Sequence, residues 1–175
     1  MTGYPFVVIV DRVPTAAQVH ALIALDDGPR VERVPREGIG RVRFRRPGPD
    51  LAGAIVSAVR DIEAVGLRPV RLIDYDWVTL ADVARRIGRS RETVRLWSVG
   101  RIGPGGFPPP LNPGRETLFF SWVEVAPWLR EGMGLPVAVP DPLLTAANLA
   151  LQLRALAPRL GGSGLVRVLL ADGEV

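Results

Sequence analysis

Residues 78–97 read VTLADVARRIGRSRETVRLW, which predicts two short helices joined by a tight turn. Thr79 is placed to cap the first helix, and Asp82 three residues later completes a capping box. Gly88 can adopt the left-handed conformation in which a helix commonly ends. Ser90 is then a natural cap for the second helix. The stretch therefore predicts a helix-turn-helix, an arrangement that presents its second helix to the major groove of DNA.

The apolar residues of this stretch predict which helix faces are buried. Those of the first helix follow the i, i+3, i+4, i+7 spacing: Leu80, Val83, Ala84 and Ile87. In the second helix, Val94 and Trp97 repeat at i, i+3. The outward side chains of the second helix are then Arg91, Glu92, Thr93, Arg95 and Ser98. A helical hairpin in an ordinary core would share the apolar pattern, but it would not normally crowd this many arginines into one hairpin.

The residues after this hairpin have the pattern of a wing. Gly and Pro dominate residues 103–114, so neither a helix nor a central strand is expected there. Residues 117–120 are predicted as a short strand, and Ser121 with Glu124 as the capping box of a further helix. The buried residues of that helix would be Trp122, Val125 and Leu129.

The segment resembles the excisionase-like and MerR-like winged-helix family in LADVARRIGRSRETVRLW, GGFPPP, LFF and SWVEVAPWL. The resemblance covers residues 77–131 and implies a bacterial DNA-binding protein. It implies a recognition helix over residues 90–99 and a wing between Arg101 and Arg115. Arg89 departs from the pattern, because many relatives carry a small apolar residue at that turn position. The chain has no long heptad run, so it is closer to the compact excisionase-like branch than to regulators with a dimerisation coiled coil.

The charge of the chain is concentrated in the same segment. The formal net charge is +4, and all 22 basic residues are arginine. Residues 1–76 carry +1, residues 77–131 carry +3, and residues 132–175 are neutral. An excess of positive charge is what attraction to phosphates requires.

Several chemistries are excluded by composition. Without lysine there is no Walker A loop and no Schiff base, and without cysteine there is no disulfide or thiolate metal site. His20 is the single histidine, and we expect it to be structural or a surface residue. Asp11, Asp74 and Asp76 are placed more like surface residues at strand ends than like an acid/base pair. We therefore expect a protein that is not an enzyme, with no cofactor and no metal.

Residues 1–76 are predicted to form a separate ferredoxin-like domain, so the expected fold class is α+β. Strands and helices alternate as β-α-β-β-α-β: residues 6–10, 15–25, 30–36, 39–46, 51–65 and 70–75. The hairpin carries a series of arginines: Arg30, Arg33, Arg36, Arg41, Arg43 and Arg45. These are either a second nucleic-acid surface or a solvated face matched by Glu32 and Glu37, and we favour the solvated face. Phe44 should face the helices, which leaves no aromatic pair for stacking on bases.

Residues 132–175 are predicted as a Pro-rich linker, an apolar helix over residues 143–157, and an edge strand over residues 165–170. The helix has a thin polar stripe of Thr145, Asn148 and Gln152, so its leucines should be covered by protein. Docking on the N-terminal domain and pairing in a homodimer both satisfy this requirement, and we favour the homodimer.

Taken together, these patterns predict a bacterial transcriptional regulator that binds double-stranded DNA at specific sequences. The candidate DNA-binding residues are Arg85, Arg86, Arg89, Ser90, Arg91, Glu92, Thr93, Arg95, Arg101 and Arg115. Two alternatives stay open: an accessory DNA-bending protein of phage or plasmid recombination, and an antitoxin-type module that binds a protein through the N-terminal domain. No run of 18 apolar residues and no signal peptide is evident, so a cytoplasmic location is expected.

Overall fold

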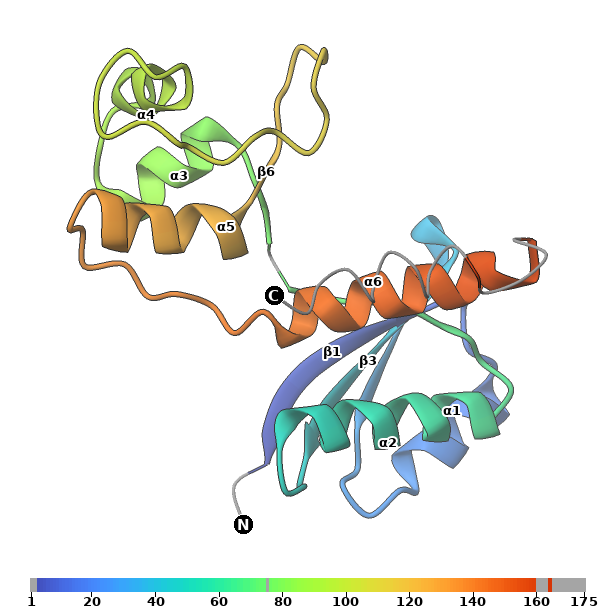
Figure 1. The fold of residues 1–175 in the computed structure, drawn as a ribbon. Helices are drawn as coiled ribbons and strands as arrows, with labels where there is room; N and C mark the ends of the chain where they lie inside the picture. Colours follow the sequence, from blue (N-terminus) through green and yellow to red (C-terminus); the bar gives the residue numbers. More distant parts are fainter. Residues whose placement is uncertain (1–2, 75, 160–163, 165–175) are drawn as a thin grey trace. The chain divides into compact units, whose positions relative to one another are not determined.

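The computed structural model describes residues 3–74, 76–159 and 164, and it is a mixed α+β structure with two units (Figure 1). Unit 1 consists of Met1–Ile73 and Ala146–Val175, and unit 2 is Asp74–Thr145. The sequence predicts borders at residues 76 and 131 instead. Most of the predicted Pro-rich linker packs against the core of unit 2 through Leu135, Val137 and Val139. Within the described part of the chain, no helix has the length and apolar character needed to cross a membrane.

A four-stranded antiparallel sheet forms the centre of unit 1. In chain order its elements are β1 (Tyr4–Val10), α1 (Ala16–Ile23), β2 (Arg30–Val34), the 3-10 turn η1 (Pro35–Glu37), β3 (Ile39–Arg46), α2 (Leu51–Ala64) and β4 (Pro69–Leu72). The strand order is β2-β3-β1-β4, so β2 and β4 are the edges. The predicted β-α-β-β-α-β order is present, with a last strand of residues 69–72 where the sequence predicts 70–75.

Alternate residues of the central strands face α1 and α2, which lie on one face of the sheet (Figure 1). The buried core on that side comprises Phe6, Val8, Val10, Leu22, Val42, Phe44, Ile55, Val59 and Ile62. Phe6 and Phe44 are paired in register and stack with their ring centroids 5.4 Å apart. Phe44 therefore faces the helices, as its alternation with Arg43 and Arg45 predicts.

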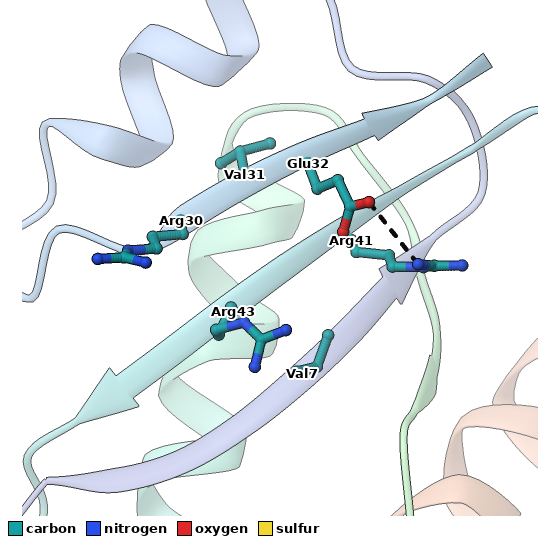
Figure 2. Close-up of a pocket in the computed structure, with 6 residues that line it drawn as sticks. All are labelled: Val7, Arg30, Val31, Glu32, Arg41 and Arg43. Carbon is teal, nitrogen blue, oxygen red and sulfur yellow. Dashed lines mark ion pairs between the residues drawn. The ribbon is translucent and has the colours of Figure 1, made fainter.

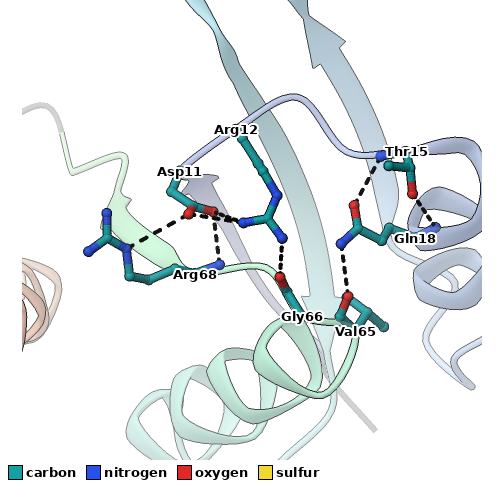
Figure 3. Close-up of polar contacts among 7 residues, drawn as sticks. All are labelled: Asp11, Arg12, Thr15, Gln18, Val65, Gly66 and Arg68. Atoms are coloured by element: carbon teal, nitrogen blue, oxygen red, sulfur yellow. Dashed lines mark hydrogen bonds and ion pairs between the residues drawn. The ribbon is translucent and has the colours of Figure 1, made fainter.

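Polar contacts join the start of α1 to the end of α2 (Figure 3). Gln18 completes a capping box at the start of α1, and its side-chain amide donates to the carbonyl of Val65 at 2.9 Å. Asp11 accepts the backbone N–H of Arg68 at 3.0 Å and forms an ion pair with Arg12 at 3.1 Å. Asp11 is thus half-buried at the end of β1, and its oxygens hold two loops of unit 1 together.

A buried arginine at the end of β3 closes the helix-facing side of the sheet. Arg46 is 6% exposed, and its guanidinium forms ion pairs with Asp27 at 2.9 Å and with Asp61. It also donates to the hydroxyl of Ser57 at 2.8 Å. Burial opposes the charge, but the two carboxylates outweigh burial and raise the pKa of Arg46 above its usual value. Arg46 is thus a structural cation, in contrast to its neighbours in β3.

The C-terminal helix α6 (Leu143–Leu156) satisfies the open edge of the sheet. The side-chain amide of Asn148 in this helix accepts the N–H of Leu72 at 2.7 Å and donates to the carbonyl of Leu72 at 3.0 Å. Because β4 is an edge strand, these backbone groups would otherwise lack a partner strand. An ion pair between Arg154 and Glu63 of α2 fixes the other end of the helix to unit 1.

The sequence pattern did not indicate which side of this helix packs against unit 1. Asn148, on the thin polar stripe of the sequence pattern, is 6% exposed and is the buried residue of the helix. In the single chain, Leu149 and Leu156 are 62% and 50% exposed, so unit 1 does not cover them. The helix carries apolar side chains on most of its sides, so its sequence pattern specifies no single buried side. The side that is buried is the one with Asn148, because its amide can satisfy the polar backbone groups at the edge of the sheet. The predicted edge strand at residues 165–170 lies outside the described residues.

Unit 2 combines short helices with a small antiparallel strand pair. Its elements are β5 (Trp77–Val78), α3 (Leu80–Ile87), α4 (Arg91–Ser98), β6 (Phe120–Ser121), α5 (Trp122–Pro127) and a π-helical turn, η2 (Trp128–Gly132). Trp77 pairs with Ser121, and Val78 pairs with Phe120. The core comprises Val78, Val83, Ala84, Val94, Trp97, Phe120, Trp122, Val125, Ala126 and Leu129. The predicted burial is confirmed for Val83, Ala84, Val94, Trp97, Trp122, Val125 and Leu129. Leu80 and Ile87 are only partly buried, and the buried Ala126 was not predicted.

A buried carboxylate, and not a capping box, begins α5. Asp76 is 4% exposed, and it accepts the backbone N–H of Val123 at 2.7 Å and the hydroxyl of Ser121 at 3.0 Å. The prediction of a capping box between Ser121 and Glu124 was wrong, because the Ser121 hydroxyl makes no bond to the helix. The expectation that Asp76 lies at the surface was also wrong, because Asp76 is buried. The β5–β6 pairing brings Asp76 to the helix start from a distant part of the chain.

Candidate nucleic-acid interface

The turn between α3 and α4 has the caps that the sequence predicts. The Thr79 hydroxyl accepts the N–H of Asp82 at 3.2 Å, and the Asp82 carboxylate accepts the N–H of Thr79 at 2.9 Å. Gly88 ends α3 in the left-handed conformation, with φ at 64°. The Ser90 hydroxyl then accepts the N–H of Thr93 at 3.0 Å and begins α4. Local interactions therefore set the turn before any long-range packing is considered.

The buried face of α4 determines which side chains the helix presents. Val94 is fully buried and Trp97 is 5% exposed, and Trp97 packs against Trp128 with ring centroids 5.9 Å apart. Arg91 and Arg95 are four residues apart and lie on the opposite face, where both are exposed. The helix is thus held from behind, and its exposed face carries mostly charged groups.

Glu92 and Arg95 form an ion pair on this exposed face. Two of the three guanidinium nitrogens of Arg95 donate to the two carboxylate oxygens of Glu92 at 2.8 and 2.6 Å. The hydrogen bond from Arg95 lowers the pKa of Glu92, and the hydrogen bond to Glu92 raises the pKa of Arg95. The sequence predicts that Arg95 is free to contact a base, but here it has an acceptor that a ligand would have to displace. Arg91 has no such acceptor within the described residues.

The hydroxyl groups of the two polar residues at the start of α4 are hydrogen-bonded to each other. The hydroxyls of Ser90 and Thr93 lie 2.8 Å apart and share a hydrogen bond. Thr93 is half-buried, whereas Ser90 is exposed. Thr93 is one of the candidate DNA-binding residues that the sequence indicates. Its bond to Ser90 makes the cap of the helix its first role.

The arginines of α3 and the turn differ in what holds them. Arg85 forms an ion pair with Asp82 at 2.9 Å. The guanidinium of Arg86 lies over the ring of Trp122, 4.5 Å from its centroid, which is a cation–π contact. Arg89 is exposed, and no ion pair holds it within the described chain. Of these three, Arg89 is the least constrained, which fits its position in the turn.

The loop after α4 is anchored by aromatic side chains. Phe107 packs edge-on against Phe120 and Trp128, with centroids 5.5 and 5.0 Å apart. The indole N–H of Trp128 donates to the carbonyl of Gly105 at 2.8 Å. A Cβ atom at Gly103 would lie 3.2 Å from the Trp97 ring, so this glycine permits the loop to pass close to the core. The loop therefore has a fixed base although it lacks regular structure.

The outer part of the loop is closed by one asparagine. The Asn112 amide donates to the carbonyl of Thr117 at 2.8 Å and accepts the N–H of Phe119 at 2.8 Å. The N–H of Leu111 donates to the carbonyl of Phe119 at 2.8 Å. These bonds hold residues 113–116 in a projecting turn that carries the exposed Arg115 (Figure 1).

The predicted strand at residues 117–120 was wrong in extent. Only residues 120 and 121 form strand β6. The backbone groups of Thr117 and Phe119 are taken by the Asn112 side chain, so they cannot extend the ladder with β5. Sequence reasoning missed Asn112, and it placed Trp128 near the buried face of its helix without predicting the contact with Gly105. The PLNPG motif at residues 110–114 marks a turn, but it does not say which backbone groups the asparagine will bind.

The charge of unit 2 is uneven. With the borders that the structure gives, the unit has eight arginines and eight acidic residues, and the net excess of four arginines belongs to unit 1. The predicted concentration of charge in residues 77–131 depended on a border that left out Asp74, Asp76 and Asp141. Within residues 79–101, however, six arginines stand against only Asp82 and Glu92. Positive charge is therefore local to the α3–α4 hairpin.

The carboxylates considered as candidates for catalysis are engaged in hydrogen bonds within the fold. Asp76 is buried with its acceptors occupied, and Asp74 accepts the backbone N–H of Asp76 at 3.3 Å. Asp11 is engaged in unit 1. No group of three or more His, Cys, Asp and Glu residues suited to a metal occurs in the part of the chain that the structure describes. His20 is exposed on α1.

No family model, no curated protein and no solved structure matches this chain.

Proposed function

We propose that unit 2 is a winged-helix domain that binds double-stranded DNA at specific sequences, in a transcriptional regulator. The observation that carries this proposal is the exposed charged face of α4, opposite its buried Val94 and Trp97. A helix of this length can enter a major groove when one of its faces packs on a core and a glycine turn precedes it, as in a helix-turn-helix. The resemblance of residues 77–131 to the excisionase-like and MerR-like family supports the same proposal.

The proposed roles of the side chains follow from their present partners. Arg91 is exposed at the first turn of α4 and is the best candidate to donate two hydrogen bonds to guanine. Arg95 and Glu92 would enter the groove as a pair and exchange their mutual bonds for bonds to bases. Arg89 and Arg101, both exposed, would hold phosphates on either side of the helix. Arg85 and Arg86 would support the backbone contact, and Arg115 would reach DNA from the wing.

We propose a ferredoxin-like arrangement for unit 1, supported by the strand order β2-β3-β1-β4 with two helices on one face. A fold of this kind hosts many functions, so it adds no chemistry by itself. We also propose that the protein is a homodimer. The exposed Leu149 and Leu156 on α6 support this, because soluble monomers rarely leave such residues together on a surface.

Selection of bound sequences from a random DNA library, using the full chain, tests the proposed function. We expect enrichment of one motif, and an inverted repeat would agree with a symmetric dimer. Direct repeats would favour the recombination accessory protein over the regulator. A variant with Arg91→Ala and Arg95→Ala should lose the enrichment, whereas Arg130→Ala, an exposed arginine outside the hairpin, should keep it. Absence of any enrichment with the wild-type chain would remove the proposal.

A further inference from the structure

The face of the sheet turned away from α1 and α2 is rich in arginine. The strand register places its side chains in rows that cross the strands. One row is Arg30, Arg43 and Val7, and the next is Glu32, Arg41, Ile9 and Arg71. Arg45 lies beside Pro5 at the end of the same face. Figure 2 shows the hollow that the first row and its neighbours line.

The two rows differ in how their charges are balanced. In the second row, Arg41 forms ion pairs with Glu32 at 3.7 Å and with Glu37 at 3.1 Å. In the first row, Arg30 and Arg43 are direct cross-strand partners, and neither has an ion pair within the described residues. Only the second row therefore fits the expectation of a solvated face matched by Glu32 and Glu37.

A pair of like charges directly opposite each other destabilises an antiparallel ladder. Both Arg30 and Arg43 are exposed, so nothing in the fold requires either cation. The buried Nε–H of Arg41, which also lines the hollow, has no hydrogen-bond acceptor among the described residues. Features that are unfavourable for the fold alone, such as this like-charge pair and this unsatisfied N–H group, tend to occur at functional sites. An anion placed between Arg30 and Arg43 would remove their mutual repulsion.

We propose that this face of unit 1 binds the phosphate backbone of nucleic acid, independently of base sequence. Along β3, Arg41, Arg43 and Arg45 repeat at every second residue, about 6.6–6.8 Å apart, which suits a ligand with regularly repeated charges. The face carries Val7 and Ile9 but no aromatic side chain among its described residues, so it offers no platform for stacked bases. Phosphate contacts without base contacts give affinity without sequence information.

This surface would complement the proposed role of α4. Because one chain carries both units, binding through one raises the effective concentration of DNA at the other. The inference does not depend on that role, however, since contacts to phosphate would persist if unit 2 read no sequence.

The test compares two double variants of the full chain that each remove two positive charges from the same hairpin. The first is Arg30→Gln with Arg43→Gln, on the proposed surface. The control is Arg33→Gln with Arg36→Gln, because Arg33 pairs with Gly40 and lies on the opposite face, and Arg36 lies in η1. Binding to a labelled random-sequence duplex is measured by fluorescence anisotropy at several salt concentrations.

The slope of log K against log salt is negative, and each phosphate that a protein neutralises contributes roughly 0.9 to its magnitude. We therefore expect the Arg30/Arg43 variant to reduce the magnitude of this slope by about two. The control should keep a slope close to that of the wild type. Thermal unfolding should show that the Arg30/Arg43 variant is at least as stable as the wild type, because a like-charge pair has been removed. A weaker affinity combined with unchanged or higher stability separates binding from folding.

Three results would overturn the proposal. One is an equal decrease of affinity in both double variants, which would mean that only the net charge matters. Another is a wild-type chain that does not bind the random duplex. The third is competition by poly-glutamate as effective as competition by unlabelled duplex at equal charge, which would indicate an acidic protein as the partner. If sequence selection fails while the Arg30/Arg43 effect is present, the proposed function of α4 falls and this inference stands.

Discussion

Asn148 binds Leu72 in the way that a neighbouring strand would. Its side-chain oxygen accepts the Leu72 N–H at 2.7 Å and its side-chain nitrogen donates to the Leu72 carbonyl at 3.0 Å. A single amide on α6 thus satisfies both outward-facing groups of one residue at the edge of the sheet. This pair explains why α6 buries a polar residue while leucines beside it remain exposed.

Replacing Asn148 by leucine should therefore destabilise unit 1 although it adds apolar character. The backbone groups of Leu72 would be left unsatisfied under the helix, at a cost of about 1–3 kcal/mol. Urea unfolding followed by far-UV circular dichroism measures the change. Gln152→Leu on the exposed part of the same helix is the control and should shift the free energy of unfolding by less than about 0.5 kcal/mol. Equal effects of the two substitutions would contradict the assigned role of Asn148.

The second prediction concerns the aromatic packing behind α4. Trp97 is 5% exposed and packs against Trp128, so Trp97→Ala should cost roughly 3–5 kcal/mol. Thermal melting of the full chain, with near-UV circular dichroism as the probe, reports the destabilisation. Val99→Ala serves as the control, because Val99 lies just after α4 and is 56% exposed. A Trp97 variant that melts like the wild type would place this ring outside the core.

The third prediction separates two accounts of how α5 begins. Asp76 accepts the Val123 N–H and the Ser121 hydroxyl, so Asp76→Ala should destabilise unit 2 by about 1–3 kcal/mol. Glu124→Ala should have little effect, since the predicted capping box with Ser121 is not formed. Chemical denaturation of both variants decides between them. A larger effect of Glu124→Ala than of Asp76→Ala would restore the capping box.

The fourth prediction is a dependence of stability on pH at the start of α3. Hydrogen bonds from the hydroxyl and the backbone N–H of Thr79 lower the pKa of Asp82, and Arg85 adds to this effect. Because the folded pKa lies below the unfolded one, the stabilisation is fully present above about pH 4. It disappears as the pH falls through the lowered pKa.

The free energy of unfolding should thus differ between wild type and Asp82→Asn at pH 6, and the difference should shrink as the solution is made more acidic. Urea unfolding at a series of pH values measures this difference. A difference that stays constant from neutral to strongly acidic solution would mean that the ionised carboxylate contributes nothing.

The fifth prediction concerns the ion pair on α4. Glu92→Gln releases Arg95 and removes a negative charge from the proposed interface, so binding to random DNA should strengthen severalfold. Arg95→Ala should weaken binding to a selected site on the order of tenfold and relax preference at one base pair. Arg101→Ala should weaken selected and random DNA equally, because a phosphate contact carries no sequence information. Gel-shift titrations on both kinds of DNA give these ratios, and identical sequence-blind effects for Arg95 and Arg101 would refute the assigned roles.

Local patterns in the sequence were enough to predict the elements that are stabilised by near neighbours. The caps at Thr79 and Ser90 and the left-handed Gly88 depend on residues a few positions apart, so a linear reading finds them. The same holds for the alternation that turns Phe44 inward and Arg43 outward, since a strand has a period of two. The α+β class and the order of elements in unit 1 follow from such periods.

The tertiary structure alone decided the contacts made across the chain. Asp76 reaches the start of α5 over an interval of 47 residues, and Asn148 reaches Leu72 over 76 residues. Arg30 and Arg43 become neighbours only through the register of β2 and β3. In each case a polar group is fixed by where an unsatisfied partner lies in space, and sequence periodicity carries no information about that distance. The sequence by itself determined which faces are apolar, and folding determined which polar groups those faces bring together.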